Sequence, residues 1–104
     1  MIVEERIYRL HVGCMAEFLE VYERDGLPIQ SRILPKLIGF FTTEVGPLNV
    51  VVHMWAYADL AERAAKRVEL QADPGWAGYL AKVRPLIAEQ ENRILVPTRF
   101  SPIK

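Results

Sequence analysis

Residues 39–57, which read GFFTTEVGPLNVVVHMWAY, constrain the fold of this chain most strongly. Two runs rich in β-branched and aromatic residues flank a Gly46-Pro47 turn, which predicts two strands joined by a short connection. Side chains along a strand point alternately to opposite faces. In the second run, one face carries Leu48, Val50, Val52 and Met54, and the other carries Asn49, Val51, His53, Trp55 and Tyr57. The first face resembles a plain core, whereas the second mixes rings with hydrogen-bonding groups, as ligand pockets do.

The rest of the chain is interpreted from hydrophobic periodicity and turn residues. The predicted order is a strand over 2–10, a helical segment over 15–34, strands over 38–45 and 48–57, a helix over 59–71, a helix from 73 and a strand over 93–100. Gly26 and Pro28 are expected to break the first helical segment, because glycine ends helices and proline fits only a first turn. Asp59 is a suitable N-cap, and Pro74 suits a first helical position.

Pro97 is informative about the order of the predicted strands. A proline cannot donate a hydrogen bond to a neighbouring strand, so within a strand it belongs at a sheet edge or a bulge. The last strand is an edge strand in the split βαβ arrangement. The chain is therefore predicted to be α+β, with a ferredoxin-like βαββαβ antiparallel sheet and helices on one face. Its length suits a single domain over residues 1–104.

The composition argues against several classes of function. Thirteen Lys and Arg balance thirteen Asp and Glu without a basic run, so neither nucleic acid nor an acidic membrane is an expected partner. The single cysteine, Cys14, cannot form an intrachain disulfide. Charges from Glu4 onward do not fit a signal peptide or a transmembrane segment, so a cytoplasmic location is expected. No glycine-rich phosphate loop or metal-ligand spacing is evident, so no cofactor is predicted.

A sheet with helices on one face leaves its other face to be covered. We expect that second face to carry the mixed residues of the 48–57 strand, together with Glu4, Arg6, Tyr8 and Leu10. The rings are too large to leave in water, and the charges are too costly to bury unpaired. A homodimer that packs two such faces together would enclose a barrel-like cavity and would let Arg6 pair with Glu4 or Glu44.

The candidate site residues lie on this second face. His53 is the predicted catalytic residue, because its near-neutral pKa suits a proton carrier; the alternative is a structural histidine bonded to a neighbouring strand. Arg6 and Tyr8 are predicted to bind the polar end of a ligand, and the alternative is a buried ion pair of Arg6. Trp55 and Tyr57 would stack on a planar ligand or, alternatively, form the dimer core.

Four further residues are weaker candidates. Asn49 and Glu44 complete the predicted ligand-binding set, although Asn49 also suits a role in stabilising the turn. Arg63 and Arg67 are one helical turn apart and would clamp an anion together, or else form part of a solvated charged face. No cluster of histidines with metal-ligand spacing accompanies them.

Several segments together form a specific pattern. They are Glu4-Glu5-Arg6-Ile7-Tyr8, the GFFTTEVGPLN run over 39–49, Val52-His53-Met54-Trp55-Ala56-Tyr57, Glu62-Arg63, Arg67, Asp73-Pro74, Trp76 and Phe100-Ser101-Pro102. In these segments, and over nearly its whole length, the chain resembles the NIPSNAP family. The resemblance implies a dimeric α+β barrel, in which ferredoxin-like units pair sheet to sheet. The chain departs from the family pattern at Glu5, where an apolar residue is usual, and no targeting segment is expected ahead of the first strand.

The resemblance leaves the biochemical role open, because many NIPSNAP-like proteins have no settled one. The wider dimeric α+β barrel class includes cofactor-independent monooxygenases and haem-using enzymes, which is an analogy of fold alone. We expect a cytoplasmic homodimer that binds a small, partly aromatic or carbonyl-bearing molecule, with oxygen chemistry without a cofactor as the first reaction to test. The alternatives are a non-catalytic interaction or ligand-sensing protein and, more weakly, haem binding through His53.

Overall fold

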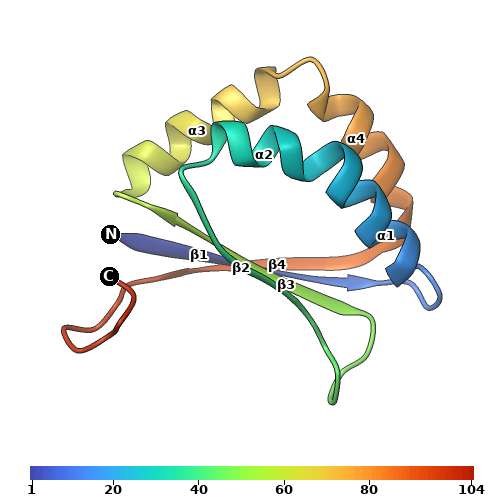
Figure 1. The fold of residues 1–104 in the computed structure, drawn as a ribbon, viewed down its shortest axis with the longest axis horizontal. Helices are drawn as coiled ribbons and strands as arrows, with labels where there is room; N and C mark the ends of the chain where they lie inside the picture. Colours follow the sequence, from blue (N-terminus) through green and yellow to red (C-terminus); the bar gives the residue numbers. More distant parts are fainter.

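The chain forms one sheet with a layer of helices on one of its faces, as the computed structural model of residues 1–104 shows (Figure 1). The elements are β1 (Ile2–Leu10), α1 (Met15–Val21), η1 (Tyr22–Gly26), α2 (Leu27–Ile33), β2 (Lys36–Thr42), β3 (Val50–Tyr57), α3 (Leu60–Ala72), α4 (Trp76–Val83), η2 (Arg84–Leu86) and β4 (Ile87–Leu95). Both termini lie at the same end of the molecule.

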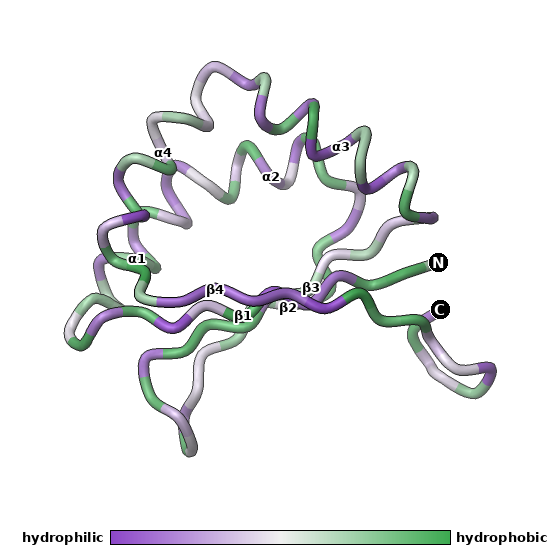
Figure 2. Tube along the Cα trace, turned by 180° about the vertical axis from the view of Figure 1, so that it is seen from behind, coloured by the Kyte–Doolittle hydropathy of each residue, from purple (hydrophilic) through white to green (hydrophobic).

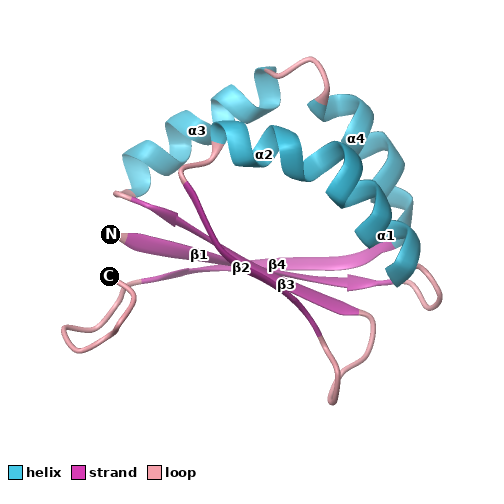
Figure 3. Ribbon diagram, viewed as in Figure 1, coloured by secondary structure: helices cyan, strands magenta, loops and turns pink.

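The sheet has the strand order β2-β3-β1-β4, and every neighbouring pair is antiparallel. This is the predicted ferredoxin-like arrangement, with the last strand at an edge. All helices pack on the same face of the sheet, and the other face carries no helix (Figure 3). The fold class predicted from the sequence is therefore confirmed.

The predicted break at Gly26 and Pro28 is not a break. The backbone stays helical from α1 to α2, and η1 between them is a π-helical turn in which the Leu27 N–H donates to the Tyr22 carbonyl. A π-helical turn contains one residue more than an α-helical turn. In a continuous α-helix Pro28 would remove a hydrogen bond, because proline has no N–H group, and the wider turn lies directly before it. Gly26 has a separate role, because a Cβ atom there would lie 2.7 Å from the ring of Tyr79. Glycine thus allows η1 to pack closely against α4.

The bounds of the last strand were predicted wrongly. β4 spans Ile87–Leu95 instead of 93–100, so it begins six residues earlier and Pro97 lies beyond its end. The middle of β4 is hydrophilic (Figure 2) and exposed, so its sequence lacks the apolar residues that usually indicate a strand. Polar side chains suit an edge strand, and two of them pair with β1: Glu89 with Arg9 and Arg93 with Glu5.

The predicted helix starts are confirmed in one case and shifted in the other. The Asp59 carboxylate accepts a hydrogen bond from the Glu62 N–H at 2.8 Å, as expected of an N-cap. α4 begins at Trp76, two residues after Pro74, because residues 73–75 form a turn. In that turn the Asp73 carboxylate accepts from the Gly75 N–H at 2.8 Å.

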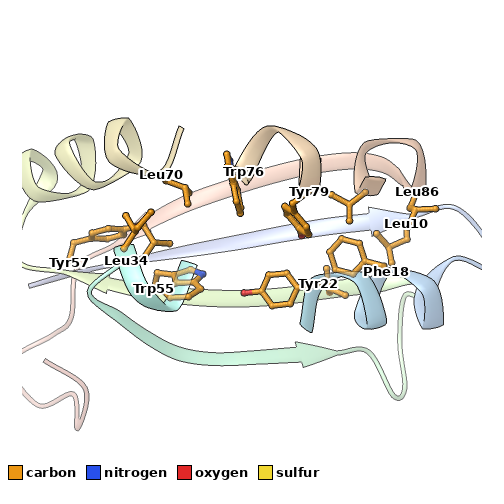
Figure 4. Close-up of a cluster of buried hydrophobic side chains, with 13 residues drawn as sticks. Leu10, Phe18, Tyr22, Leu34, Trp55, Tyr57, Leu70, Trp76, Tyr79 and Leu86 are labelled. Atoms are coloured by element: carbon orange, nitrogen blue, oxygen red, sulfur yellow. The ribbon is translucent and has the colours of Figure 1, made fainter. Parts of the chain in front are cut away.

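The helices cover the opposite face of the sheet from the one that we predicted. His53, Trp55 and Tyr57 are almost completely buried, whereas Val52 and Met54 lie half-buried on the open face. Trp55 and Tyr57 belong to the same buried cluster as Tyr22, Trp76 and Tyr79 of the helical layer, and in Figure 4 Tyr57 lies beside Leu34 and Leu70. Rings from both layers pack between the helices and the sheet, and hydrogen bonds such as that from Trp55 to His53 pair part of the polar groups among them.

Candidate functional site

A cavity of about 480 Å³ lies between the helix layer and the sheet, within a single protomer. This volume is in the range of small-molecule pockets. Its polar and charged lining residues are Arg6, Gln30, His53, Arg67, Gln71, Arg84 and Gln90. Its other lining residues are Tyr8, Phe18, Tyr22, Phe40, Trp76, Ala77, Tyr79, Leu80, Val83 and Ile87. The exposed members Gln71, Ala77, Arg84 and Gln90 mark where the cavity opens to solvent.

The structure brings three of the predicted site residues together. Arg6 and Tyr8 from β1 and His53 from β3 all line the cavity. Arg6 Nε donates a hydrogen bond to the Tyr8 hydroxyl at 2.8 Å. The His53 ring stacks on Phe40, with 4.7 Å between ring centroids, and meets the Tyr8 ring edge-on at 5.1 Å. The imidazole is therefore held between two rings on a rigid sheet.

The other predicted ligand-binding residues do not line the cavity. Trp55 and Tyr57 are buried beside it. Asn49 adopts a positive φ of 63° and its carbonyl accepts a hydrogen bond from the Leu10 N–H, which fits the alternative role in the turn. Glu44 is exposed in the β2–β3 connection and forms no ion pair with Arg6. Their roles in ligand binding stay predictions that the geometry of this cavity does not favour.

A hydrogen bond fixes which nitrogen of His53 carries the proton. Trp55 Nε1 donates to His53 Nδ1 at 2.9 Å. Because an indole N–H can only donate, Nδ1 must accept, and a neutral imidazole then has its proton on Nε2. Nε2 is buried and has no partner in the protein. A buried N–H donor without a partner costs free energy, so it favours a ligand with an acceptor oxygen.

His53 is also held neutral. Burial, followed by the charge of Arg6, lowers the pKa of His53 to about 3, and the Glu4 carboxylate offsets only part of this effect. At neutral pH the imidazole is therefore an uncharged hydrogen-bond donor. It has no free lone pair with which to take a proton from a ligand.

Glu4 organises the charged side of the site. It is fully buried, and its Oε2 atom accepts hydrogen bonds from Arg6 at 3.0 Å, Arg63 at 2.7 Å and Asn92 at 2.7 Å. Burial alone would raise the pKa of Glu4, but the bonds from Arg63 and Asn92 and the charge of Arg6 lower it to about 2. The ion pair of Arg6 with Glu4, one of the alternatives from the sequence, is thus present. The pairing of Arg63 with Arg67 as an anion clamp is not favoured, because Arg63 is bonded to Glu4 while Arg67 lines the cavity.

Sequence reasoning missed the contribution of the helices to the site. Tyr22 in η1 donates a hydrogen bond to Gln30 Oε1 at 2.5 Å, and both residues line the cavity. Trp76 and Tyr79 of α4 form its opposite wall, with ring centroids 4.9 Å apart. Burial raises the pKa of the Tyr22 and Tyr79 hydroxyls, so both stay protonated at neutral pH. The hydroxyl groups of Tyr22 and Tyr79 and the amide of Gln30, which lie among apolar residues in the helical segments, were the available signal.

The fold and the cavity define the class of protein: a ferredoxin-like α+β unit with a ligand-sized pocket enclosed between its sheet and its helices. The NIPSNAP family model matches residues 3–102. The chain belongs to the NIPSNAP family. None of its helices has both the length and the apolar character that crossing a membrane requires.

The relatives agree with this assignment. The protein NipSnap of Drosophila melanogaster is 37% identical over 101 residues, which are 97% of this chain and 36% of that protein. The chain thus spans about a third or less of the length of the curated relatives it matches. A solved NIPSNAP family protein with unknown function from Agrobacterium tumefaciens is 45% identical with a TM-score of 0.97, covering 100% of this chain and 94% of that one.

More distant structures share the fold alone. A structure described as an antibiotic biosynthesis monooxygenase is 12% identical to this chain, with a TM-score of 0.67. The alignment covers 94% of this chain and 99% of that one. At this level of identity the similarity concerns the path of the backbone, and the site has to be judged from its own residues.

Proposed function

We propose that this protein binds a small planar molecule, partly aromatic and carrying a carbonyl or phenol oxygen, in the cavity between its helices and its sheet. One observation carries this proposal. His53 lines the cavity, and its buried Nε2–H group has no hydrogen-bond partner in the protein. An acceptor oxygen of the ligand would satisfy it. The stacked and edge-on rings around His53 would hold a planar body.

The lining favours binding over catalysis by proton abstraction. No Asp or Glu lines the cavity, the Nδ1 atom of His53 is occupied by Trp55, and Tyr22 and Tyr79 stay protonated. A general base needs a free proton-accepting atom near the substrate. We therefore infer that His53 acts as a hydrogen-bond donor and not as the predicted proton carrier. Ligand sensing without catalysis is the second candidate function.

Oxygen chemistry without a cofactor remains compatible with the site for one kind of substrate. The hydroxyl of a hydroquinone has a pKa of about 10, as other phenols do, and its ionisation would be favoured if the phenolate oxygen accepted from His53 Nε2–H near the charge of Arg6. Haem ligation by His53 is less compatible. It would require the Nε2 lone pair and a proton on Nδ1, where Trp55 already donates.

The test of the proposed function is a variant that fills the cavity. Ala77 lines the cavity on α4 and its side chain is exposed, so Ala77→Trp is expected to block the cavity without disturbing the core. We expect mass spectrometry of the natively purified protein to identify a bound aromatic molecule that the variant lacks. If the protein catalyses oxidation, wild type should consume dioxygen with added hydroquinone faster than the uncatalysed reaction does. Ala77→Trp should lose this activity.

The control is Ala81→Trp, which places the same ring on α4 at an exposed position that does not line the cavity. It is expected to retain the bound molecule. A wild-type protein without any bound molecule, or equal recovery from all three proteins, would contradict the proposal. Dioxygen consumption equal to the uncatalysed rate in wild type, with the molecule bound, would favour ligand sensing.

We further propose that the protein is a homodimer that pairs through the open face of the sheet. This face is the one we first took for the core. Ile7, Val52 and Met54 lie half-buried on it, and Phe41 at its side keeps 55% of its surface exposed. A contiguous apolar sheet face of this kind is typical of a surface that another chain covers. The cytoplasmic location expected from the sequence stays a prediction.

Val52→Glu is expected to convert the dimer into a monomer, because it places a charge in the middle of this face without a partner. Light scattering after size exclusion should give twice the mass of one chain for wild type and the mass of one chain for the variant. Val68→Glu is the control, since Val68 is 69% exposed on α3. A wild-type protein that is monomeric at micromolar concentration would refute the dimer.

A further inference from the structure

The cavity lining carries an unbalanced positive charge. Arg6, Arg67 and Arg84 line the cavity, and no acidic residue does. The whole chain has equal numbers of acidic and basic residues, so the imbalance is local. Arg6 pairs with Glu4, with 3.0 Å between Oε2 and Nη1, although Glu4 is shared with Arg63. The charges of Arg67 and Arg84 remain.

Neither Arg67 nor Arg84 has a counter-charge in the protein. Neither forms an ion pair or a side-chain hydrogen bond. Arg67 is half-buried on α3, and Arg84 is exposed in η2 where the cavity opens. By contrast, more exposed arginines such as Arg24 take carboxylate partners on the surface. A half-buried guanidinium that faces a cavity without a counter-charge attracts an anion.

The shape of the remaining lining limits which anion fits. Six of the lining residues are Tyr, Phe or Trp, and their rings would contact a ring system better than a small inorganic ion. Gln71 and Gln90 stand with Arg84 among the exposed lining residues, and their amides add neutral donors there. A planar carboxylate matches the fork of donors that a guanidinium presents.

We propose that the ligand is an aromatic carboxylate, with its carboxylate bound by the unpaired Arg67, its rings between the sheet and α4, and Arg84 adding positive charge at the opening. This inference rests on the proposed function and narrows the ligand to one chemical class. The far end of such a ligand would reach His53, where an oxygen acceptor would meet Nε2–H. The unpaired arginines and the neutral donor of His53 would thus bind different ends of the ligand.

The test compares two probes of the same shape, 2-naphthoate and its neutral amide 2-naphthamide, by calorimetric titration of the full chain at pH 7. Because charge-assisted hydrogen bonds are stronger than neutral ones, we expect 2-naphthoate to bind at least about tenfold more tightly. Added salt should reduce this preference, since the opening of the cavity is exposed to screening. Arg67→Gln and Arg84→Gln should each reduce it further while 2-naphthamide binding stays the same.

Arg24→Gln is the matched control, because Arg24 is an exposed arginine on η1 that does not line the cavity. It should keep the full preference for 2-naphthoate. Equal affinity of wild type for both probes would overturn the aromatic carboxylate while leaving the proposed binding function in place. Binding of neither probe would also overturn the aromatic carboxylate, whereas the proposed binding function is decided separately by the molecule that co-purifies with the protein. A preference unchanged in both arginine variants would show that the anion is held elsewhere.

Discussion

Glu4→Ala is expected to lower the free energy of unfolding by about 3–5 kcal/mol at pH 7, a large fraction of the stability of a small domain. Glu4 is fully buried, and its Oε2 atom binds Arg6 and Arg63 at 3.0 Å and 2.7 Å. Its removal leaves two guanidinium groups without their counter-charge and Asn92 without an acceptor. Urea unfolding at fixed protein concentration measures the loss.

The adjacent residue supplies the control for this prediction. Glu5 points to the open face of the sheet and pairs at 3.2 Å with Arg93, an exposed side chain, so Glu5→Ala should cost about 1 kcal/mol or less. Glu4→Gln retains an acceptor oxygen without the charge and should lie between the two. Equal losses for Glu4→Ala and Glu5→Ala would mean that the buried carboxylate does not hold the two arginines.

Wild-type protein is expected to lose about 4 kcal/mol of stability through His53 alone as the pH falls from 6.5 to 3. The pKa of His53 is lowered from its usual 6.5 to about 3 in the folded state. The unfolded chain therefore binds more protons in this window, and the stabilisation that is complete above pH 6.5 disappears toward pH 3. Glu4, with its pKa lowered from 4.5 to about 2, adds a further loss below pH 4.5.

His53→Gln separates the two contributions, because glutamine does not titrate but still offers an acceptor to Trp55. The variant should lack the loss between pH 6.5 and 4.5 and keep the loss at lower pH. Denaturant unfolding at a series of pH values gives both profiles. His11→Gln, at the exposed turn after β1, is the control and should follow wild type. Parallel profiles of wild type and His53→Gln would show that burial does not keep the imidazole neutral.

The topology could be predicted from the sequence because several independent signals agree. The strand pattern of β1 and β3 and the N-cap at Asp59 support one ferredoxin-like arrangement. The last strand does lie at an edge, although Pro97, from which this was predicted, lies beyond its end. The bounds of an element were predicted wrongly where polar residues form the strand. The exposed charges of β4 resemble a loop, yet they pair across the sheet edge with Arg9 and Glu5.

The face of the sheet that receives the helices could not be predicted from hydropathy. β3 has an aliphatic side with Val52 and Met54 and an aromatic side with His53 and Trp55, and hydropathy favours the aliphatic one as core. The deciding interactions are long-range. Trp55 satisfies His53, and Arg63 from α3 satisfies Glu4 from β1, so polar groups that looked too costly to bury are paired. Such pairs become visible only when the elements are placed in space.

The position of the cavity has a consequence for how the assembled molecule would respond to its ligand. The cavity lies on the helix side of the sheet, and the sheet itself separates it from the open face, so two copies that pair through that face would hold two separate pockets. Two paired copies would then bind one ligand for each chain. The binding curve should be a simple hyperbola unless the strands transmit strain from one pocket to the other.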